Sequence, residues 1–336
     1  MIMTTLAQSA HDPWWRSPVV RKNAIVFVFA LFLIVGTAVS RGRLVEPGNL
    51  SNILFQSSVI GVLALGEALV MLTGGIDLSI VALMVASAIF MGGAGSELQQ
   101  QMSMSNALPY VGFLPAIAIA MIGAAGVGLI NGLMVVVLRI PAFIATLVMA
   151  LVLSGVSMLF TGGAPIYNPD AFFADLGATR IFTLPVPVYI FLVLTAVIGV
   201  LLARSKLGVV LYALGGNSRA ARLSGIAVER TTVAIYTLSG LLSGLAGFLF
   251  LARTGSVAPT SGDNFLLGTI AAVVVGGVSL AGGKGSIRNA FVGVLFLATL
   301  SNFLNILLVS PHIQDAISGV VIILAIAINA RLDPDA

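Results

Sequence analysis

The sequence contains no cysteine and few charged residues or histidines. Only 8% of its 336 residues are Asp, Glu, Lys or Arg, whereas soluble domains carry about 25%. This scarcity excludes a soluble enzyme, a nucleic-acid binder and a disordered chain. The absence of Cys excludes disulfides, thiolate catalysis and Cys-ligated zinc. His11 and His312 are isolated in the sequence. We therefore expect no catalytic residue, no metal site and no cofactor on this chain.

Long apolar runs take the place of charge, because 59% of the residues are hydrophobic. A membrane-spanning helix needs about 20 apolar residues, so we predict an all-α polytopic membrane protein with about ten transmembrane helices. Residues 1–23 form an N-terminal segment and residues 24–330 a single transmembrane domain. The predicted helices cover residues 24–39, 52–73, 80–95, 111–138, 142–160, 184–203, 228–252, 265–281, 287–309 and 313–330.

The basic residues predict the orientation of these helices. If the N-terminus is cytoplasmic, only Arg41, Arg43, Arg180 and Arg253 fall outside, and all the other Lys and Arg fall inside. Cytoplasmic loops are enriched in Lys and Arg, so we expect both termini to be cytoplasmic. The first span then acts as an uncleaved signal anchor. Residues 96–110 and 161–183 are predicted external loops, either plain connectors or docking surfaces for an external partner.

Small residues recur at the spacing of packed helices. Gly128 and Gly132 are four positions apart, as are Gly240 and Gly244. This spacing lets helix backbones approach closely in a membrane, so we predict that most of the glycines serve packing and breaks.

The segment 74–79, with the sequence GGIDLS, interrupts the apolar pattern between two predicted helices. Paired glycines release the backbone from helical geometry, and Asp77 or Ser79 can cap the helix that follows. The segment is either a cytoplasmic turn or a break inside the membrane that lines a pathway. Glu67, Asn131 and Asn302 are further polar residues within apolar runs, where such residues are functional candidates.

A basic loop covers residues 204–230 on the predicted inner side. Residues 218–223 fit a short helix that carries Arg219 and Arg222 on one face. Such a helix can lie on lipid headgroups or dock into a soluble partner. A second inner segment covers residues 276–286. The phosphate-binding pattern requires Gly where this segment has Val278, and Ser or Thr where it has Gly285, so the segment does not match. We therefore expect no ATP binding by this chain itself.

Several blocks together resemble a known family: TGGIDLS at 73–79, RIPAFIATL at 139–147, TGG at 161–163, ALGGNSRAARLSGI at 213–226 and IAAVVVGGVSLAGGKGSI at 270–287. They are similar to the permease subunits of ribose-type bacterial ABC sugar importers, the inner-membrane components of binding-protein-dependent transport systems. The resemblance extends from about residue 45 over nearly the whole chain. It implies an architecture like that of the vitamin B12 importer permease.

The resemblance also implies partners. A second permease copy or a paralogue completes the translocation pathway in the bacterial inner membrane. A separate cytoplasmic ATPase carries ATP and Mg, and a periplasmic sugar-binding protein delivers the solute. The resemblance implies no nucleic acid. Block 213–226 is similar to the coupling helix that enters the ATPase. The residues carried over for this role are Gly215, Asn217, Arg219, Ala220, Ala221, Arg222 and Gly225.

The candidate pathway residues come mainly from polar positions within apolar runs and from the interrupted segment 74–79. Two departures from the family pattern concern them: Glu67 stands where relatives usually carry Gln, and residues 266–270 lack a Glu-Leu-Asp motif. The sequence specifies neither the sugar nor the role of Glu67. The predicted lining residues are Glu67, Asp77, Ser79, Phe143, Thr146 and Asn302.

Two interpretations of function follow. The first is a permease subunit that imports a ribose-like monosaccharide or polyol by alternating access, driven by ATP hydrolysis in trans. The second is an ion-coupled secondary transporter of a small polar solute, with Glu67 and Asp77 as proton sites. The basic loop favours the first, because an ion-coupled carrier needs no docking helix.

Overall fold

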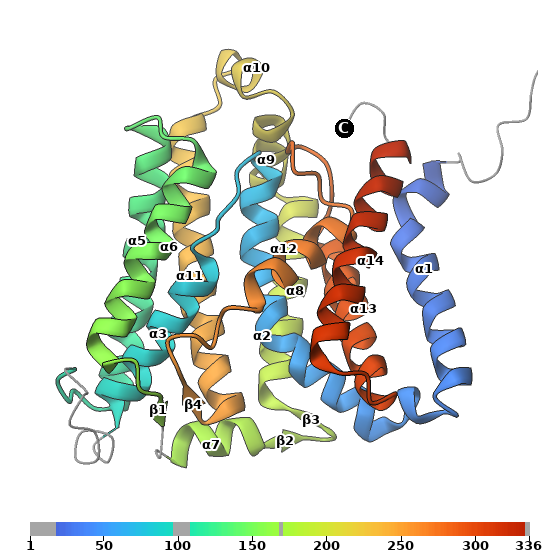
Figure 1. The fold of residues 1–336 in the computed structure, drawn as a ribbon. Coiled ribbons are helices and arrows are strands. Elements are labelled where there is room, and N and C mark those ends of the chain that lie inside the picture. The colour runs from blue at the N-terminus through green and yellow to red at the C-terminus, as the bar shows by residue number, and fades with distance from the viewer. Residues whose placement is uncertain (1–17, 97–107, 168–170, 333–336) are drawn as a thin grey trace, which may run out of the picture.

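Helices make up nearly all regular structure in residues 18–96, 108–167 and 171–332, which a computed structural model describes. This confirms the predicted all-α class (Figure 1). The helices are α1 (Pro18–Val39), η2 (Arg43–Val45), α2 (Pro47–Leu72), α3 (Ile80–Gly95), α5 (Phe113–Val136), α6 (Ala142–Thr161), α7 (Ala171–Ala178), α8 (Val186–Arg204), α9 (Lys206–Gly216), α10 (Ser218–Leu223), α11 (Val228–Thr254), α12 (Phe265–Val275), α13 (Ile287–Ile306) and α14 (Pro311–Leu332).

Two short strand pairs lie at one end of the bundle, beside α7 (Figure 1). β1 (Ile166–Tyr167) pairs antiparallel with β4 (Ser256–Val257), and β2 (Arg180–Ile181) pairs with β3 (Leu184–Pro185). The first pair joins the segment after α6 to the segment after α11. The predicted loop 161–183 thus contains one short helix and two strands among its described residues.

Within the described residues, six helices are long and apolar enough to cross a membrane: α2, α5, α6, α8, α11 and α13. α2 and α11 are mostly buried, whereas α5, α6 and α8 expose apolar side chains along much of their length. Exposed apolar surface of this extent suits a lipid environment or contact with another chain.

Glycines bring α5 and α11 into close contact, as their spacing predicts. A Cβ atom on Gly128 would lie 3.0 Å from the Thr237 Cα atom, and one on Gly240 would lie 3.1 Å from the Gly128 Cα atom. By contrast, Gly123 and Gly126 on the same helix face open space. Close backbone approach therefore depends on particular glycines rather than on the whole run.

Two of the predicted spans, α3 and α12, are too short to cross the bilayer alone. α3 has 16 residues and α12 has 11, which corresponds to about 24 and 16 Å against a hydrocarbon thickness of about 30 Å. The prediction of a helix over 265–281 is wrong at its end, because α12 stops at Val275. The next residues are glycine-rich, and Gly277, Gly282 and Gly283 have positive φ angles that a helix does not allow.

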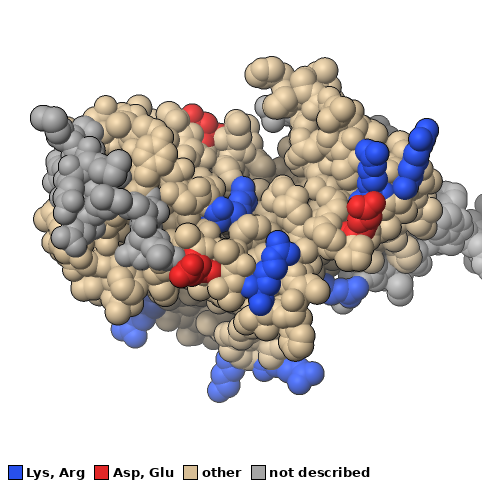
Figure 2. All heavy atoms as spheres, turned by 90° about the horizontal axis from the view of Figure 1, so that it is seen from below, with Lys and Arg blue, Asp and Glu red and all other residues tan. Residues whose placement is uncertain are grey.

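The two ends of the bundle differ in charge. α10 projects at one end and α7 lies at the other (Figure 1). Seen from the α7 end, the surface is mostly uncharged, and its charged side chains are scattered rather than gathered in one patch (Figure 2). The described basic residues at the α10 end are Arg139, Arg204, Lys206, Arg219, Arg222, Arg230, Lys284 and Arg288.

Candidate functional site

The segment between α2 and α3 enters the bundle rather than turning at its surface. From the end of α2 the chain descends toward the middle, where α3 begins (Figure 1). Asp77 is 1% exposed and Ser79 is fully buried. Of the two alternatives for residues 74–79, the structure favours the break inside the bundle. Irregular backbone at membrane depth requires partners from the protein itself.

Asp77 receives hydrogen bonds from two directions. Its Oδ1 accepts from the Ser79 backbone N–H at 3.0 Å and from the Ser79 hydroxyl at 2.6 Å. Its Oδ2 accepts from the Ser239 hydroxyl of α11 at 3.1 Å. The Asn131 amide of α5 donates in turn to the Ser79 Oγ at 2.8 Å. Both carboxylate oxygens are therefore engaged, and the start of α3 is tied to α5 and α11.

Glu67 and Thr146 hold the same segment from other helices. The Asp77 N–H donates to the Glu67 Oε1 at 3.4 Å, and the Leu78 N–H donates to the Thr146 Oγ1 at 3.0 Å. The Thr146 hydroxyl also lies 3.2 Å from the Ile76 carbonyl oxygen, which can accept from it. These side chains satisfy backbone groups that the broken geometry leaves unpaired.

Three buried polar atoms of this cluster have no hydrogen-bond partner within the described part of the chain. They are the Glu67 Oε2, the Asn131 Oδ1 and the Tyr236 hydroxyl. The Tyr236 hydroxyl lies against residues 74–79, because a Cβ atom on Gly75 would be 2.5 Å from it. The cluster thus combines a fully paired Asp77 with neighbours that retain hydrogen-bonding capacity.

The structure brings together four of the predicted pathway residues, Glu67, Asp77, Ser79 and Thr146. It adds Ser239 and Tyr236, which the sequence analysis did not select as site residues. Of the other two predicted residues, Phe143 brings only its backbone carbonyl to the cluster, 3.5 Å from the Thr146 hydroxyl, and Asn302 lies elsewhere. The Phe143 side chain is 52% exposed on α6, and Asn302 pairs with Asn49 across α13 and α2.

The predicted coupling loop forms two short helices. The Asn217 side chain caps α10 by accepting a hydrogen bond from the Ala220 N–H at 2.9 Å. Gly225 has a φ of 83° just after the helix, a conformation that favours glycine at a helix end. Ala221 is buried and clusters with Leu214 and Val228. A cap, a stop and an apolar contact therefore fix this six-residue helix.

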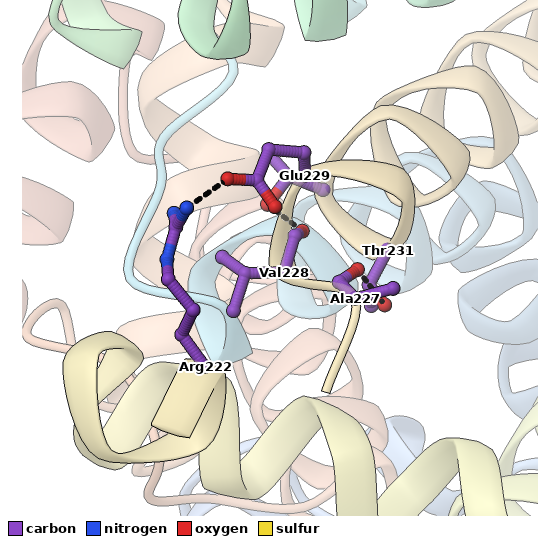
Figure 3. Close-up of polar contacts among 6 residues, drawn as sticks. Arg222, Ala227, Val228, Glu229 and Thr231 are labelled. Atoms are coloured by element: carbon purple, nitrogen blue, oxygen red, sulfur yellow. Dashed lines mark hydrogen bonds and ion pairs between the residues drawn. The ribbon is translucent and has the colours of Figure 1, made fainter. Parts of the chain in front are cut away.

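An ion pair joins α10 to the next helix. The Arg222 guanidinium contacts the Glu229 carboxylate in the first turn of α11 (Figure 3). Both side chains are largely exposed, so the pair is worth about 0–1 kcal/mol. Arg219 lies on the same short helix and is exposed. The pair therefore adds little to the stability of the fold.

The base of this loop contacts both irregular segments through backbone atoms. A Cβ atom on Gly215 would overlap the Leu72 carbonyl oxygen and the Gly283 nitrogen. The Gly283 N–H donates to the Leu72 carbonyl at 3.0 Å, and the Tyr212 hydroxyl donates to the Gly285 carbonyl at 3.0 Å. The end of α9 therefore packs on the end of α2 and on residues 276–286.

The described residues contain no group of three or more His, Cys, Asp or Glu side chains that could hold a metal ion.

Comparison with known proteins gives a family match over most of the chain. The model of the family described as branched-chain amino acid transport system / permease component matches residues 49–326. The ribose import permease protein RbsC of Escherichia coli (strain K12) is 39% identical over 334 residues, which cover 98% of this chain and 99% of that protein.

Other relatives carry the names of different sugars. RbsC of Bacillus subtilis (strain 168) is 37% identical and covers 91% of this chain and 92% of its own. The D-allose transport system permease protein AlsC of Escherichia coli (strain K12) is 30% identical over 92% of this chain and 91% of its own. No solved structure matches the chain.

Proposed function

Since the chain belongs to the family described as branched-chain amino acid transport system / permease component, we propose that it is the membrane-spanning permease subunit of an ATP-driven sugar importer. It is a multi-pass protein of the bacterial inner membrane. The family description mentions amino acids, but the relatives reported above that cover nearly the whole chain are named for ribose and allose. Those names support a monosaccharide as the solute.

The projecting helix α10 is the observation that carries the proposal. It stands at the basic end of the bundle (Figure 1), and its Leu223 side chain is 84% exposed. An apolar side chain so exposed outside the spanning helices suits insertion into a partner protein. The resemblance to permeases of ABC importers makes this partner a cytoplasmic ATPase that binds ATP and Mg.

The basic residues at the α10 end also indicate how the protein is oriented in the membrane. Cytoplasmic loops carry an excess of Lys and Arg, so the α10 end faces the cytoplasm, together with both chain termini. The shorter apolar helices complete about ten spans. The α7 end then faces the periplasm, where a sugar-binding protein docks. A second copy or a paralogue supplies the other wall of the pathway.

The mechanism is alternating access. Closure of the ATPases displaces α10, and α9 transmits this displacement to the end of α2 and to residues 276–286, which it contacts through Gly215. The end of α2 continues into the segment that starts α3, and residues 276–286 follow α12. Both α3 and α12 are interrupted helices. A shift there changes which side of the membrane the pathway faces.

Reconstitution tests the proposal. The permease is purified with its ATPase, placed in liposomes with the binding protein, and supplied with labelled ribose, allose or galactose. We expect uptake of at least one sugar that requires ATP inside the compartment equivalent to the cytoplasm. Uptake driven by a proton or sodium gradient without ATP would instead support the ion-coupled alternative.

A further inference from the structure

A cavity of about 190 Å³ lies where the two interrupted helices begin. Its walls are the first two turns of α3, the second half of α6, and the segment that leads into α12 together with the first turn of α12. Leu78 precedes α3, Ser154 and Ser157 belong to α6, and Pro259, Asp263 and Leu266 come from the third wall. The predicted pathway residues do not line it; their network lies behind Leu78 and holds its backbone in place.

The two irregular segments that precede α3 and α12 meet at this cavity. Residues 73–79 descend from the α10 end to the start of α3, and residues 258–264 rise from β4 to the start of α12 (Figure 1). They come so close that a Cβ atom on Gly262 would lie 2.6 Å from the Val81 Cγ1 atom and 3.0 Å from the Val85 Cγ2 atom. In transporters, discontinuous helices of this kind direct their N-termini at the solute near the middle of the bilayer.

Two polar groups at the cavity lack partners within the described chain. Ser157 is 3% exposed, and its buried hydroxyl makes no hydrogen bond to any described residue. Asp263 is exposed, two positions before α12 begins, and no described side chain pairs with its carboxylate. Asp263 lines the cavity from the irregular segment just before α12, so its carboxylate can accept hydrogen bonds from a solute there. An unpaired buried hydroxyl is costly unless a ligand or water uses it.

The chemistry of the walls selects the kind of ligand. A carboxylate accepts hydrogen bonds from hydroxyl groups, and Ser154 and Ser157 both donate and accept. The remaining walls are apolar. The negative charge disfavours anions. The volume leaves room for a small polar solute such as a single sugar ring.

We propose that this cavity is the sugar-contact site within the permease, with Asp263, Ser154 and Ser157 binding hydroxyl groups of the solute during passage. The proposal rests on the proposed function. It adds a place and a set of contacts, which the family match does not supply.

The absence of native cysteine allows a direct test. Ser154→Cys introduces the chain's single thiol, which a charged methanethiosulfonate reagent modifies only in contact with water. Leu159→Cys is the matched control, because Leu159 lies on the same helix and is 77% exposed on its apolar face. The complete transporter is used, with D-ribose or whichever panel sugar the unsubstituted transporter imports.

We expect modification of Ser154→Cys to slow at least fivefold when that sugar, the binding protein and ATP are present, and Leu159→Cys to stay unreactive. We also expect Asp263→Asn and Ser157→Ala to lower sugar uptake about tenfold, while ATP hydrolysis stimulated by the binding protein stays within twofold. This split between uptake and hydrolysis excludes simple misfolding.

Two failures are distinguishable. If the unsubstituted transporter imports none of the panel sugars, the proposed function fails. If it imports one, but Ser154→Cys reacts equally with and without that sugar and both other variants keep their uptake within twofold, the site assignment alone is wrong.

Discussion

The side-chain amides of Asn49 and Asn302 exchange two hydrogen bonds, of 2.8 and 3.0 Å, although they lie 253 positions apart. Asn49 belongs to the first turn of α2 and Asn302 to the last turns of α13. The Asn49 amide also donates to the Leu44 carbonyl at 2.9 Å. The pair therefore joins the connection after α1 to a distant helix, and it engages the amide that the sequence placed in the pathway.

Replacement of Asn302 by Leu should lower stability more than transport. The change leaves the Asn49 Oδ1 without a donor, which costs about 1–3 kcal/mol. We expect a lower unfolding temperature in detergent and unchanged sugar uptake per folded molecule. Asn49→Leu should act alike, and the double variant should lose less than the sum because the two residues are coupled. Reduced uptake with normal stability would instead support a pathway role for Asn302.

Gly215→Ala should impair coupling, whereas Gly216→Ala should be harmless. A methyl group at position 215 overlaps backbone atoms of Leu72 and Gly283, while a Cβ atom on Gly216 meets nothing within 4 Å. Overpacking of this kind costs about 1–3 kcal/mol, and alanine at an open helical position is neutral or favourable. Thermal unfolding and ATP-driven uptake measure both effects. Equal behaviour of the two variants would contradict the close contact.

Leu223→Asp should weaken binding of the ATPase. The side chain is 84% exposed on α10, and a charge there opposes insertion into an apolar pocket. Leu308→Asp is the control, since Leu308 is 91% exposed on the turn between α13 and α14 at the opposite end. Co-purification of the ATPase should fall about tenfold or more for the first variant only. Equal loss for both would place the docking surface elsewhere.

Glu67→Gln should be tolerated, whereas Asp77→Leu should destabilise the protein. Glu67 accepts one described hydrogen bond, which an amide oxygen preserves. Asp77 accepts three, and leucine would leave those donors buried without a partner. We expect a loss below about 1 kcal/mol for the first and several kcal/mol for the second, measured by unfolding in detergent. Severe loss for Glu67→Gln would assign its second carboxylate oxygen a role.

Apolar periodicity predicted most helices but could not locate the interruptions within them. The run 265–281 is mostly apolar, and the positive φ angle of Gly277 shows that the helix has already ended. Residues 74–79 fit both a surface turn and an internal break, because capping chemistry is the same in either place. The partners Asn131, Ser239 and Thr146 decide between them, and they come from distant helices.

The sequence does not reveal the candidate cavity for a related reason. Ser154 and Ser157 stand three positions apart in an otherwise apolar run, which was a usable signal for one polar helix face. Asp263 lies in the stretch between two predicted helices, where a charge needs no explanation. Only the structure places this stretch against Val81.

The junction between α9, the end of α2 and residues 276–286 is made of main-chain atoms at Leu72, Gly215 and Gly283. Exposed side chains change rotamer within picoseconds to nanoseconds, so a contact made through them yields before it transmits force. A contact between backbone atoms does not change with side-chain rotamers. We therefore expect a displacement of α10 to reach the end of α2 and residues 276–286 through contacts that do not depend on side-chain rotamers.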